Sequence, residues 1–425
     1  MAPAPLTLTY QLYRLLTALG APIAKRTARK RFEARNGPAE RFDERSGHAS
    51  LPRPSGRLIW MHAVSVGEFL SILDLVQDIT ATGVQVLVTT TTSSAADLAA
   101  QRLSHGVLHQ FSPLDTPQAT RRFLDHWHPD LAVFVESEIW PNQIVMAHAR
   151  GIPLALINAR LSASSLKQWQ KKPDTARSLL IRFDAIMTQT DGTRTALQSL
   201  GVLPDQLAVT GDMKAAAAAQ PVDHAAAQTL ESNLSGRPLW VASSSHDGEE
   251  ADISAAHRIV TAKSPDALLI LAPRHPERGD AVEALLRAEG WTVARRSKAQ
   301  PITGQTQIYL ADTLGETGLW YSLAPIVFIA GSFTTVGGHN PYEPAHFDCA
   351  VLHGPHYANF ELAYTEMHAA NACQEVQDGR ALGQTVSDLF GSAQLAVLQT
   401  NAKTFVTGAK NARGAVVQKL IGLIK

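Results

Sequence analysis

The sequence predicts an α/β protein of two domains, each with a parallel β-sheet covered by helices on both faces. Its 425 residues exceed what a single hydrophobic core usually supports, so two domains are expected. Short apolar segments alternate with helical segments through most of the chain, which is typical of buried parallel strands. The alternation lapses once near the middle and then resumes. We therefore expect two doubly wound sheets facing a central cleft, with ligands at the carboxyl ends of the strands.

The expected elements follow from this alternation. The first domain is expected over residues 51–215 and the second over residues 239–425. A linker is expected over residues 216–238, where an alanine run and the turn residues Pro221 and Gly236 interrupt the pattern. Strands of the first domain are expected at 58–62, 84–89, 131–135, 153–158 and 185–188, with helices at 67–80 and 93–103. Strands of the second are expected at 239–242, 267–272, 292–294, 307–311, 326–330 and 350–352.

Residues 1–50 are expected to attach the protein to a membrane surface. Residues 6–24 are apolar on balance, and residues 25–31 are mostly basic. A signal peptide carries its positive charge before the apolar stretch, and this stretch contains too many polar residues for a full span. We expect an interfacial helix with its basic residues at anionic headgroups and the body on the cytoplasmic side. An ordinary packing helix is the alternative.

The composition argues against several classes of function. Basic and acidic residues balance at 38 each, so the chain as a whole offers no case for nucleic-acid binding. The two cysteines, Cys349 and Cys373, form no CxxC pattern, which indicates a reducing compartment and no Cys-rich zinc site. Two pairs of histidines are closely spaced, His105 with His109 and His353 with His356. No carboxylate completes either pair as a metal site, so we expect no metal.

The segment at residues 331–344 contains the most specific candidate site, residues 337–343. It follows the strand expected at 326–330 and contains two adjacent glycines, which let backbone N–H groups approach an anion. Asn340 is suited to cap a helix that begins near Pro341, and the start of a helix favours negative charge. Glu343 in the first turn is placed to accept hydrogen bonds from sugar hydroxyls. A phosphate-bearing ligand is predicted here, and a glycine-rich turn with an ordinary cap is the alternative.

Two further segments of the second domain follow strands. Pro273 and Arg274 come directly after the strand expected at 267–272, where a guanidinium is placed to pair with phosphate; a surface turn is the alternative. Gly315, Glu316 and Thr317 follow another strand end, but a Gly-Glu pair in a loop is weak evidence by itself.

Carboxylates mark the strand ends of the first domain. Glu68 opens a helix after the first strand, where it is placed to act as a general base, or simply to favour the helix dipole. Glu136 and Glu138 lie two residues apart after a later strand; a carboxylate that is simply solvated is the alternative for one of them. Lys214 lies at the domain junction, where its ammonium is placed to reach a ligand; a solvated lysine is the alternative.

Eight ordered runs of the sequence resemble one family closely. The family is the 3-deoxy-D-manno-oct-2-ulosonic acid (Kdo) transferases of lipopolysaccharide assembly, and the similarity extends from about Arg41 to Asn371. The runs are HAVSVGE (62–68), ESEIWPN (136–142), NARLS (158–162), TGDMK (210–214), SSHDGEE (244–250), PRHPER (273–278), DTLGE (312–316) and GGHNPYE (337–343). So many motifs in one order are hard to explain by chance.

The resemblance implies a B-type glycosyltransferase fold of two Rossmann-like domains. It implies CMP-Kdo as the donor and a lipid A precursor (lipid IVA) as the acceptor, at the cytoplasmic face of the inner membrane. Glu68 is then the base in an inverting transfer, and Glu136 and Lys214 stabilise the transition state. No metal cofactor is implied. The residues matching the CMP-binding segments are Pro273, Arg274, Gly315, Glu316, Thr317, Asn340, Pro341, Tyr342 and Glu343.

The sequence departs from the family at Met213, Thr317 and Tyr342, where leucine is usual. Three other functions stay open. A different B-type envelope glycosyltransferase would use another nucleotide sugar. A nucleotide-sugar epimerase of similar architecture would have no need of the basic N-terminal helix. A non-catalytic nucleotide-sugar binder would have no use for Glu68.

Overall fold

Both expected sheets form, and each contains seven strands that run parallel throughout. The computed structural model describes residues 5–234 and 236–424. The chain divides into two compact units, Met1–Ala217 with Ala409–Lys425 as the first and Ala218–Gly408 as the second. The predicted fold class, two doubly wound α/β units, is confirmed.

The sheet of the first unit has the order β3-β2-β1-β4-β5-β6-β7. Its strands are β1 (Leu58–His62), β2 (Gln85–Thr90), β3 (Leu108–Phe111), β4 (Leu131–Val135), β5 (Leu154–Ala159), β6 (Ala185–Thr188) and β7 (Leu207–Val209). The helices that connect them are α3 (Val66–Thr80), α4 (Ser93–Arg102), α5 (Pro117–Trp127), α6 (Pro141–His148), α7 (Ala163–Gln170), α8 (Pro173–Leu180) and α9 (Asp191–Ser199).

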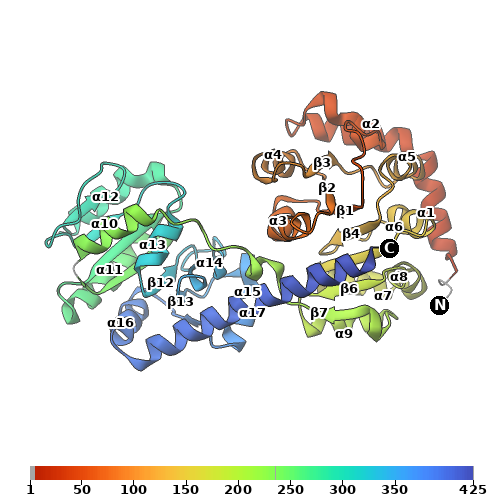
Figure 1. Ribbon diagram of the computed structural model, residues 1–425. Coiled ribbons are helices and arrows are strands. Elements are labelled where there is room, and N and C mark those ends of the chain that lie inside the picture. The colour runs from red at the N-terminus through yellow and green to blue at the C-terminus, as the bar shows by residue number, and fades with distance from the viewer. Residues whose placement is uncertain (1–4, 235, 425) are drawn as a thin grey trace. The chain divides into compact units, whose positions relative to one another are not determined.

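Strand β1 shows how one sheet supports two cores. Successive side chains of a strand point to opposite faces. Ile59 and Met61 pack in the core that includes helix α3, whereas Leu58 and Trp60 pack in the core that includes α5 and α6. Figure 1 shows the two sets of helices on either side of this sheet. Because both faces are covered, every residue of β1 is buried, which explains its continuous apolar sequence.

The sheet of the second unit has the order β10-β11-β9-β8-β12-β13-β14. Its strands are β8 (Leu239–Ser245), β9 (Leu268–Pro273), β10 (Val293–Arg295), β11 (Ile308–Leu310), β12 (Ile326–Ile329), β13 (Ala350–His353) and β14 (Cys373–Glu375). The helices are α10 (His224–Leu234), α11 (Glu249–Lys263), α12 (Gly279–Ala288), α13 (Thr317–Leu323), α14 (Tyr342–Ala345), α15 (Glu361–Ala369), α16 (Gly379–Leu389) and α17 (Ala393–Leu423). Strand order reverses beside β8 here and beside β1 in the first unit, and such switch points are where doubly wound sheets bind ligands.

The structure differs from the expected elements in three places. Strands β3, β7 and β14 were not predicted, because each lies at the edge of its sheet and is only partly buried. Helix α10 forms inside the expected linker and buries Leu230 and Leu234. The last residues of α17 belong to the first unit, where Val416, Val417 and Leu420 enter its core. Their burial there gives a physical reason why the second unit ends at Gly408.

The N-terminal segment forms two helices, α1 (Leu8–Leu19) and α2 (Ala21–Glu33), followed by a short 3-10 helix, Ala39–Ser46. Thr7 caps α1, and Pro22 in the first turn suits the start of α2. Among the described residues, none of the helices combines the length and apolar character needed to cross a bilayer.

Candidate functional site

Glu68 lies in the first turn of α3, directly beyond the carboxyl end of β1. Ser65 caps this helix through the backbone N–H of Glu68, and its hydroxyl lies 3.1 Å from Glu68 Oε1. The backbone N–H of Val64 donates to Glu68 Oε2 at 2.6 Å. These bonds fix the carboxylate at the strand end. Partial burial raises the pKa of Glu68, with a further contribution from the charge of Glu136, so its carboxylate is a stronger base than usual.

Glu136 is held between two cations. It follows β4, is buried, and lies 2.6 Å from Arg160 Nε and 3.5 Å from Lys214 Nζ. Its partners come from distant segments, the end of β5 and the 3-10 turn Met213–Ala216. A buried carboxylate requires such partners. Arg160 is exposed and Lys214 is half-buried. The two cations therefore present positive charge toward solvent while the buried carboxylate of Glu136 holds them in place.

Two of these strand ends are conformationally strained. Glu136 and Asn158 both have positive φ values, 59° and 50°, although neither is a glycine. Asn158 Oδ1 accepts hydrogen bonds from the backbone N–H of Met213 and from Gln189 Nε2, which fixes the turn that carries Lys214. Left-handed non-glycine residues cost free energy and often mark functional sites.

Glu138 is the second carboxylate of the ESEIWPN run. Trp140 Nε1 donates to Glu138 Oε2 at 2.6 Å. Burial, followed by the charge of Glu68, raises the pKa of Glu138 to about 7. Nearby His62 is fully buried against Thr89, and burial lowers its pKa to about 3, so it is neutral and unsuited to act as a base at neutral pH. The carboxylates are therefore the titratable candidates for proton transfer here.

In the second unit, part of the glycine-rich segment binds an internal carboxylate. The backbone N–H groups of Gly331, Ser332 and Phe333 donate to Glu249 at 2.7, 3.0 and 2.9 Å. The N–H of His246 donates to the same carboxylate at 3.0 Å. Glu249 is fully buried at the start of α11. The beginning of this segment therefore already holds an anion, and the part that can still meet a ligand lies further along, from about His339.

Asn340 was expected to cap the helix, but the cap position of α14 is Pro341, and Asn340 lies one residue before it. Its Oδ1 accepts from the backbone N–H of Tyr342 at 3.1 Å, and its Nδ2 donates to Glu343 Oε1 at 3.3 Å. The helix that follows, α14, has only four residues. Burial raises the pKa of Glu343. The ring of Tyr342 is buried and stacks on Phe405 at 5.9 Å, so this departure from the family's leucine faces the protein interior.

Arg274 lies just beyond β9 with an exposed guanidinium for which the described residues provide no hydrogen bond or ion pair. Its backbone N–H donates to Ser245 O at the end of β8. His246 and His339 lie in the same region, with their Nε2 atoms 2.8 Å apart. Burial, together with the charges of His246 and Arg274, lowers the pKa of His339 to about 4. Arg274 is thus an available cation among neutral imidazoles, which suits an anionic ligand.

Gly315, Glu316 and Thr317 lie at the start of α13. Gly315 has a φ of 81°, which a glycine adopts without strain. Glu316 forms an ion pair with Arg296 at 2.5 Å and accepts a hydrogen bond from the Thr313 hydroxyl. The hydrogen bond from Arg296 is the main reason why the pKa of Glu316 is lowered. Its carboxylate is therefore ionised and oriented.

The N-terminal helices form a second region of interest. Large apolar side chains of α1 and the start of α2 are exposed along one stripe; they are Leu8, Leu12, Leu15, Leu16, Leu19 and Ile23. The opposite side of α1 packs on the first unit through Tyr10, and Tyr13 donates to Asp115 at 2.7 Å. Helix α1 is therefore a packing helix that also presents an apolar face to solvent.

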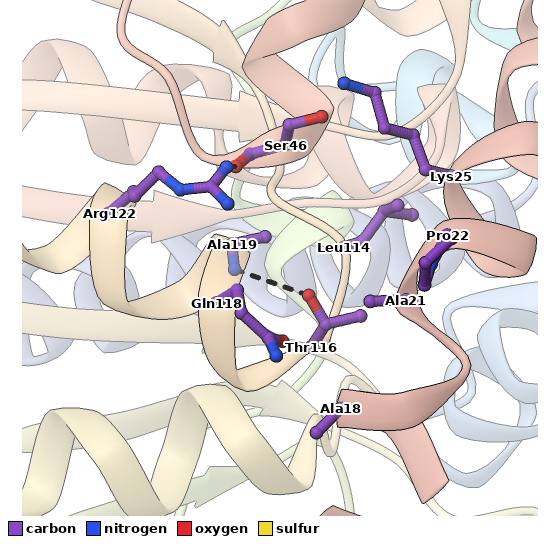
Figure 2. Close-up of a pocket in the computed structure, with 10 residues that line it drawn as sticks. All are labelled: Ala18, Ala21, Pro22, Lys25, Ser46, Leu114, Thr116, Gln118, Ala119 and Arg122. Atoms are coloured by element: carbon purple, nitrogen blue, oxygen red, sulfur yellow. Dashed lines mark hydrogen bonds between the residues drawn. The ribbon is translucent and has the colours of Figure 1, made fainter.

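Two hollows flank α2, and each includes basic residues in its lining. One, of about 400 Å³, lies between α2 and α5 and is lined partly by Lys25 and Arg122, whose guanidinium donates to Ser46 O (Figure 2). The other hollow, of about 510 Å³, lies near the start of α4 and is lined partly by Arg31, Arg35 and Arg45. Leu114 contributes to both.

The structure brings together Glu68, Glu136 and Lys214 in the first unit, and Arg274 with Asn340 and Glu343 in the second. Pro273 closes β9, and Pro341 begins the turn into α14. Arg160 and Glu249 were not predicted to have roles. Both lie in runs that are part of the family resemblance, but their partners are distant in sequence, so the residues alone do not reveal them.

Solved structures identify the class of fold. A glycosyltransferase from Rickettsia africae has a TM-score of 0.54 and 12% identity, covering 88% of this chain and 100% of that one. A UDP-GlcNAc 2-epimerase from Neisseria meningitidis bound to UDP-GlcNAc has a TM-score of 0.53 and 14% identity, covering 86% and 100%. At such identities the likeness concerns the fold alone. It is the fold of the B-type glycosyltransferases, with carboxylates and cations at its strand ends.

Sequence relatives identify the family. The family model described as 3-deoxy-D-manno-octulosonic-acid transferase matches residues 40–217. The probable mitochondrial 3-deoxy-D-manno-octulosonic acid transferase of Arabidopsis thaliana is 38% identical over 377 residues, 87% of this chain and 84% of that one. The 3-deoxy-D-manno-octulosonic acid transferase of Haemophilus influenzae is 33% identical over 383 residues, which cover 89% of this chain and 88% of that one. The chain therefore belongs to the Kdo transferase family and is a glycosyltransferase.

Proposed function

We propose that this enzyme transfers Kdo from CMP-Kdo to a lipid A precursor, lipid IVA, at the cytoplasmic face of the inner membrane, with Glu68 as the general base. Membership of the Kdo transferase family supports the transferred sugar. The observation that carries the mechanism is the fixed, partly buried carboxylate of Glu68 at the end of β1.

In this mechanism a hydroxyl of the acceptor attacks the anomeric carbon of Kdo. The new bond forms on the face opposite CMP, the bond between the anomeric carbon and the phosphate oxygen breaks, and configuration inverts. Glu68 takes the proton of the hydroxyl, and CMP leaves with the electron pair. The raised pKa of Glu68 supports this role, because a base is most effective when its pKa lies near the working pH.

Lys214 and Arg160 provide positive charge for the negative charge that develops during the transfer. Glu136 positions both cations through its two oxygens, Oε1 toward Lys214 and Oε2 toward Arg160. Preoriented charges of this kind stabilise a transition state without reorganisation. Glu136 thus acts as a positioning residue through its cations.

The second unit is proposed to bind the CMP part of the donor. Arg274 pairs with the phosphate, while Glu343 and Glu316 are placed to accept hydrogen bonds from sugar hydroxyls, assisted by Pro273, Gly315, Thr317, Asn340 and Pro341. The ring of Tyr342 is buried and has no contact with the donor in this proposal. No metal cofactor is required in the reaction, since CMP is a monophosphate whose charge an arginine can meet.

The stripe on α1 is proposed to rest on the membrane. An exposed apolar stripe followed by basic residues favours an interfacial position on anionic lipid. The two hollows beside α2 then face the phosphates of the lipid surface or acceptor. This arrangement favours a lipid acceptor over the free sugar of an epimerase, which needs no membrane.

The test is a transfer assay with lipid IVA in mixed micelles. The protein is incubated with CMP-Kdo generated in place, or with UDP-sugars under matched conditions, and nucleotide release and acceptor mass are measured. We expect CMP release with a gain of Kdo mass, and no turnover of UDP-sugars. Turnover of a UDP-sugar with no reaction of CMP-Kdo would establish the alternative transferase, and conversion without acceptor would establish the epimerase.

A further inference from the structure

Three potential metal ligands meet at one edge of the second sheet. His353 ends β13, His368 lies in the last turn of α15, and Cys373 begins β14. Their ligand atoms all lie within 4.8 Å of one another. His353 and Cys373 are buried, while His368 is half-buried. Strands β13 and β14 are neighbours in the sheet, and α15 connects them, so the topology itself brings the three side chains together.

The hydrogen bond that His353 makes through Nδ1 leaves a lone pair on its Nε2 atom. Nδ1 lies 2.7 Å from the carbonyl oxygen of Gly354. Because a carbonyl oxygen only accepts, Nδ1 carries the hydrogen, and Nε2 is directed at the cluster without one. A backbone carbonyl that orients a histidine in this way is the usual support for a histidine bound to a metal.

The other two ligands complete a set that suits zinc. His368 Nε2 lies 2.9 Å from His353 Nε2. For Cys373 Sγ, the described residues offer no hydrogen-bond partner. In contrast, the sulfur of the other cysteine, Cys349, donates to the carbonyl groups of Tyr321 and Ala324 at 3.3 and 3.2 Å. Two imidazoles and a thiolate form a typical donor set for Zn²⁺, which prefers nitrogen and sulfur ligands in a tetrahedron.

We propose that His353, His368 and Cys373 bind one Zn²⁺ ion, with a water molecule as the fourth ligand on the side where His368 meets solvent. At zinc–nitrogen distances of about 2.0 Å, two tetrahedral ligands lie roughly 3.3 Å apart, so the imidazoles need to separate by only a few tenths of an ångström. On binding, the thiol of Cys373 releases its proton to solvent and His368 Nε2 becomes unprotonated. None of the three ligands belongs to the residues proposed to bind the donor or the acceptor.

The ion would stabilise the segment that carries His339 and Asn340. Tyr364 packs on the ring of His353 at 4.1 Å, and its hydroxyl donates to His339 O at 3.0 Å. Beside the cluster, the Gly354 N–H donates to Ser332 Oγ at 2.8 Å. The sequence interpretation considered His353 only with His356 and therefore expected no metal. The ligands that matter are separated by a helix and become neighbours only in the fold.

The test compares the full-length protein with single variants. After treatment with chelator and dialysis, zinc is returned, and bound metal is measured by mass spectrometry and by competition with a coloured chelator. Replacement by Co²⁺ adds a spectroscopic reading, the thiolate-to-cobalt charge-transfer band. We expect one equivalent of metal and this band in the unchanged protein and in the control Cys349→Ser. We expect loss of the band and about tenfold or greater weakening in Cys373→Ser and in His368→Gln.

His368→Gln provides an independent test if Cys373→Ser does not fold, and circular dichroism shows which variants are folded. Zinc should also raise the melting temperature of the unchanged protein but not that of His368→Gln. Failure of the unchanged protein to bind zinc, or equal binding by Cys373→Ser, would overturn the proposal. In that case the histidines form only a hydrogen-bonded pair within the core.

Discussion

Lys214 Nζ lies 3.5 Å from Glu136 Oε1, joining the turn after β7 to the end of β4. Asn158 fixes this turn by accepting the backbone N–H of Met213 at 3.0 Å. The ammonium is therefore held in place by a buried carboxylate whose other oxygen binds Arg160. This arrangement leads to the first prediction.

We expect Lys214→Met to lower kcat by about 10²-fold with little change in CMP affinity, because the charge acts mainly in the transition state. The measurement is steady-state kinetics with a separate CMP titration by calorimetry. Lys263→Met is the matched control, since Lys263 also forms an ion pair, 3.0 Å from Asp388, but on the surface of the second unit. Equal losses in the two variants would remove Lys214 from the mechanism.

Glu138 provides a prediction on stability and pH. Its pKa in the folded protein is about 7, raised first by burial and then by the charge of Glu68. The folded state therefore binds a proton more tightly than the unfolded state, and ionisation destabilises the fold as pH rises from about 4.5 to 7. Between pH 5 and pH 8, the free energy of unfolding of Glu138→Gln should rise by about 1 to 2 kcal/mol relative to that of the unchanged protein, allowing for partial solvent screening.

This gain is measured by chemical denaturation of both proteins at the two pH values, followed by a probe of the first unit such as tryptophan fluorescence. The difference between them should be small at pH 5 and larger at pH 8. A difference that does not vary with pH would mean that Glu138 titrates in its ordinary range.

Arg274 is predicted to be a main determinant of CMP affinity. Its guanidinium is exposed and lies near neutral histidines, so pairing with a phosphate requires no existing ion pair to break. Arg274→Ala should weaken CMP binding by about 10- to 100-fold, the value of one charge-assisted hydrogen bond. Calorimetry tests this, with Arg380→Ala as the control because Arg380 is also exposed, on α16. Unchanged affinity in Arg274→Ala would place the phosphate elsewhere.

The stripe on α1 is predicted to bind membranes without supporting the fold. A double change, Leu12→Glu with Leu16→Glu, should reduce sedimentation with anionic vesicles at least several-fold while the melting temperature stays nearly constant. Leu314→Glu is the control, since Leu314 is 77% exposed in the second unit. If the double variant binds vesicles as well as the control does, the stripe is not the contact. A lower melting temperature of the double variant would instead point to a packing role for these leucines.

The sequence was most informative where strands are buried on both faces. Continuous apolar runs such as that of β1 predict parallel strands, and nearly all of the expected strands are present within one or two residues. Strand β7 was not predicted, because it lies at the edge of its sheet and two of its three residues are exposed. In the candidate site, Glu68 and Arg274 were predicted from their positions after strands.

The roles of Arg160 and Glu249 depend on contacts between distant segments, which local patterns do not encode. Arg160 reaches Glu136 from the end of another strand. Glu249 resembles any acidic residue in a first helical turn, yet it binds three N–H groups more than 80 residues away. Its partners, residues 331–333, precede the ligand site predicted at residues 337–343, which stays a prediction.

The central claim is that Glu68 removes the proton of the acceptor hydroxyl during Kdo transfer. The most direct measurement is the mass of lipid IVA after incubation with CMP-Kdo and either the unchanged protein or Glu68→Gln, in parallel with CMP binding by both. We predict a gain of Kdo mass with the unchanged protein, a rate lower by about 10² to 10⁴-fold with the variant, and CMP affinity equal within error. Transfer by Glu68→Gln at the unchanged rate would contradict the account.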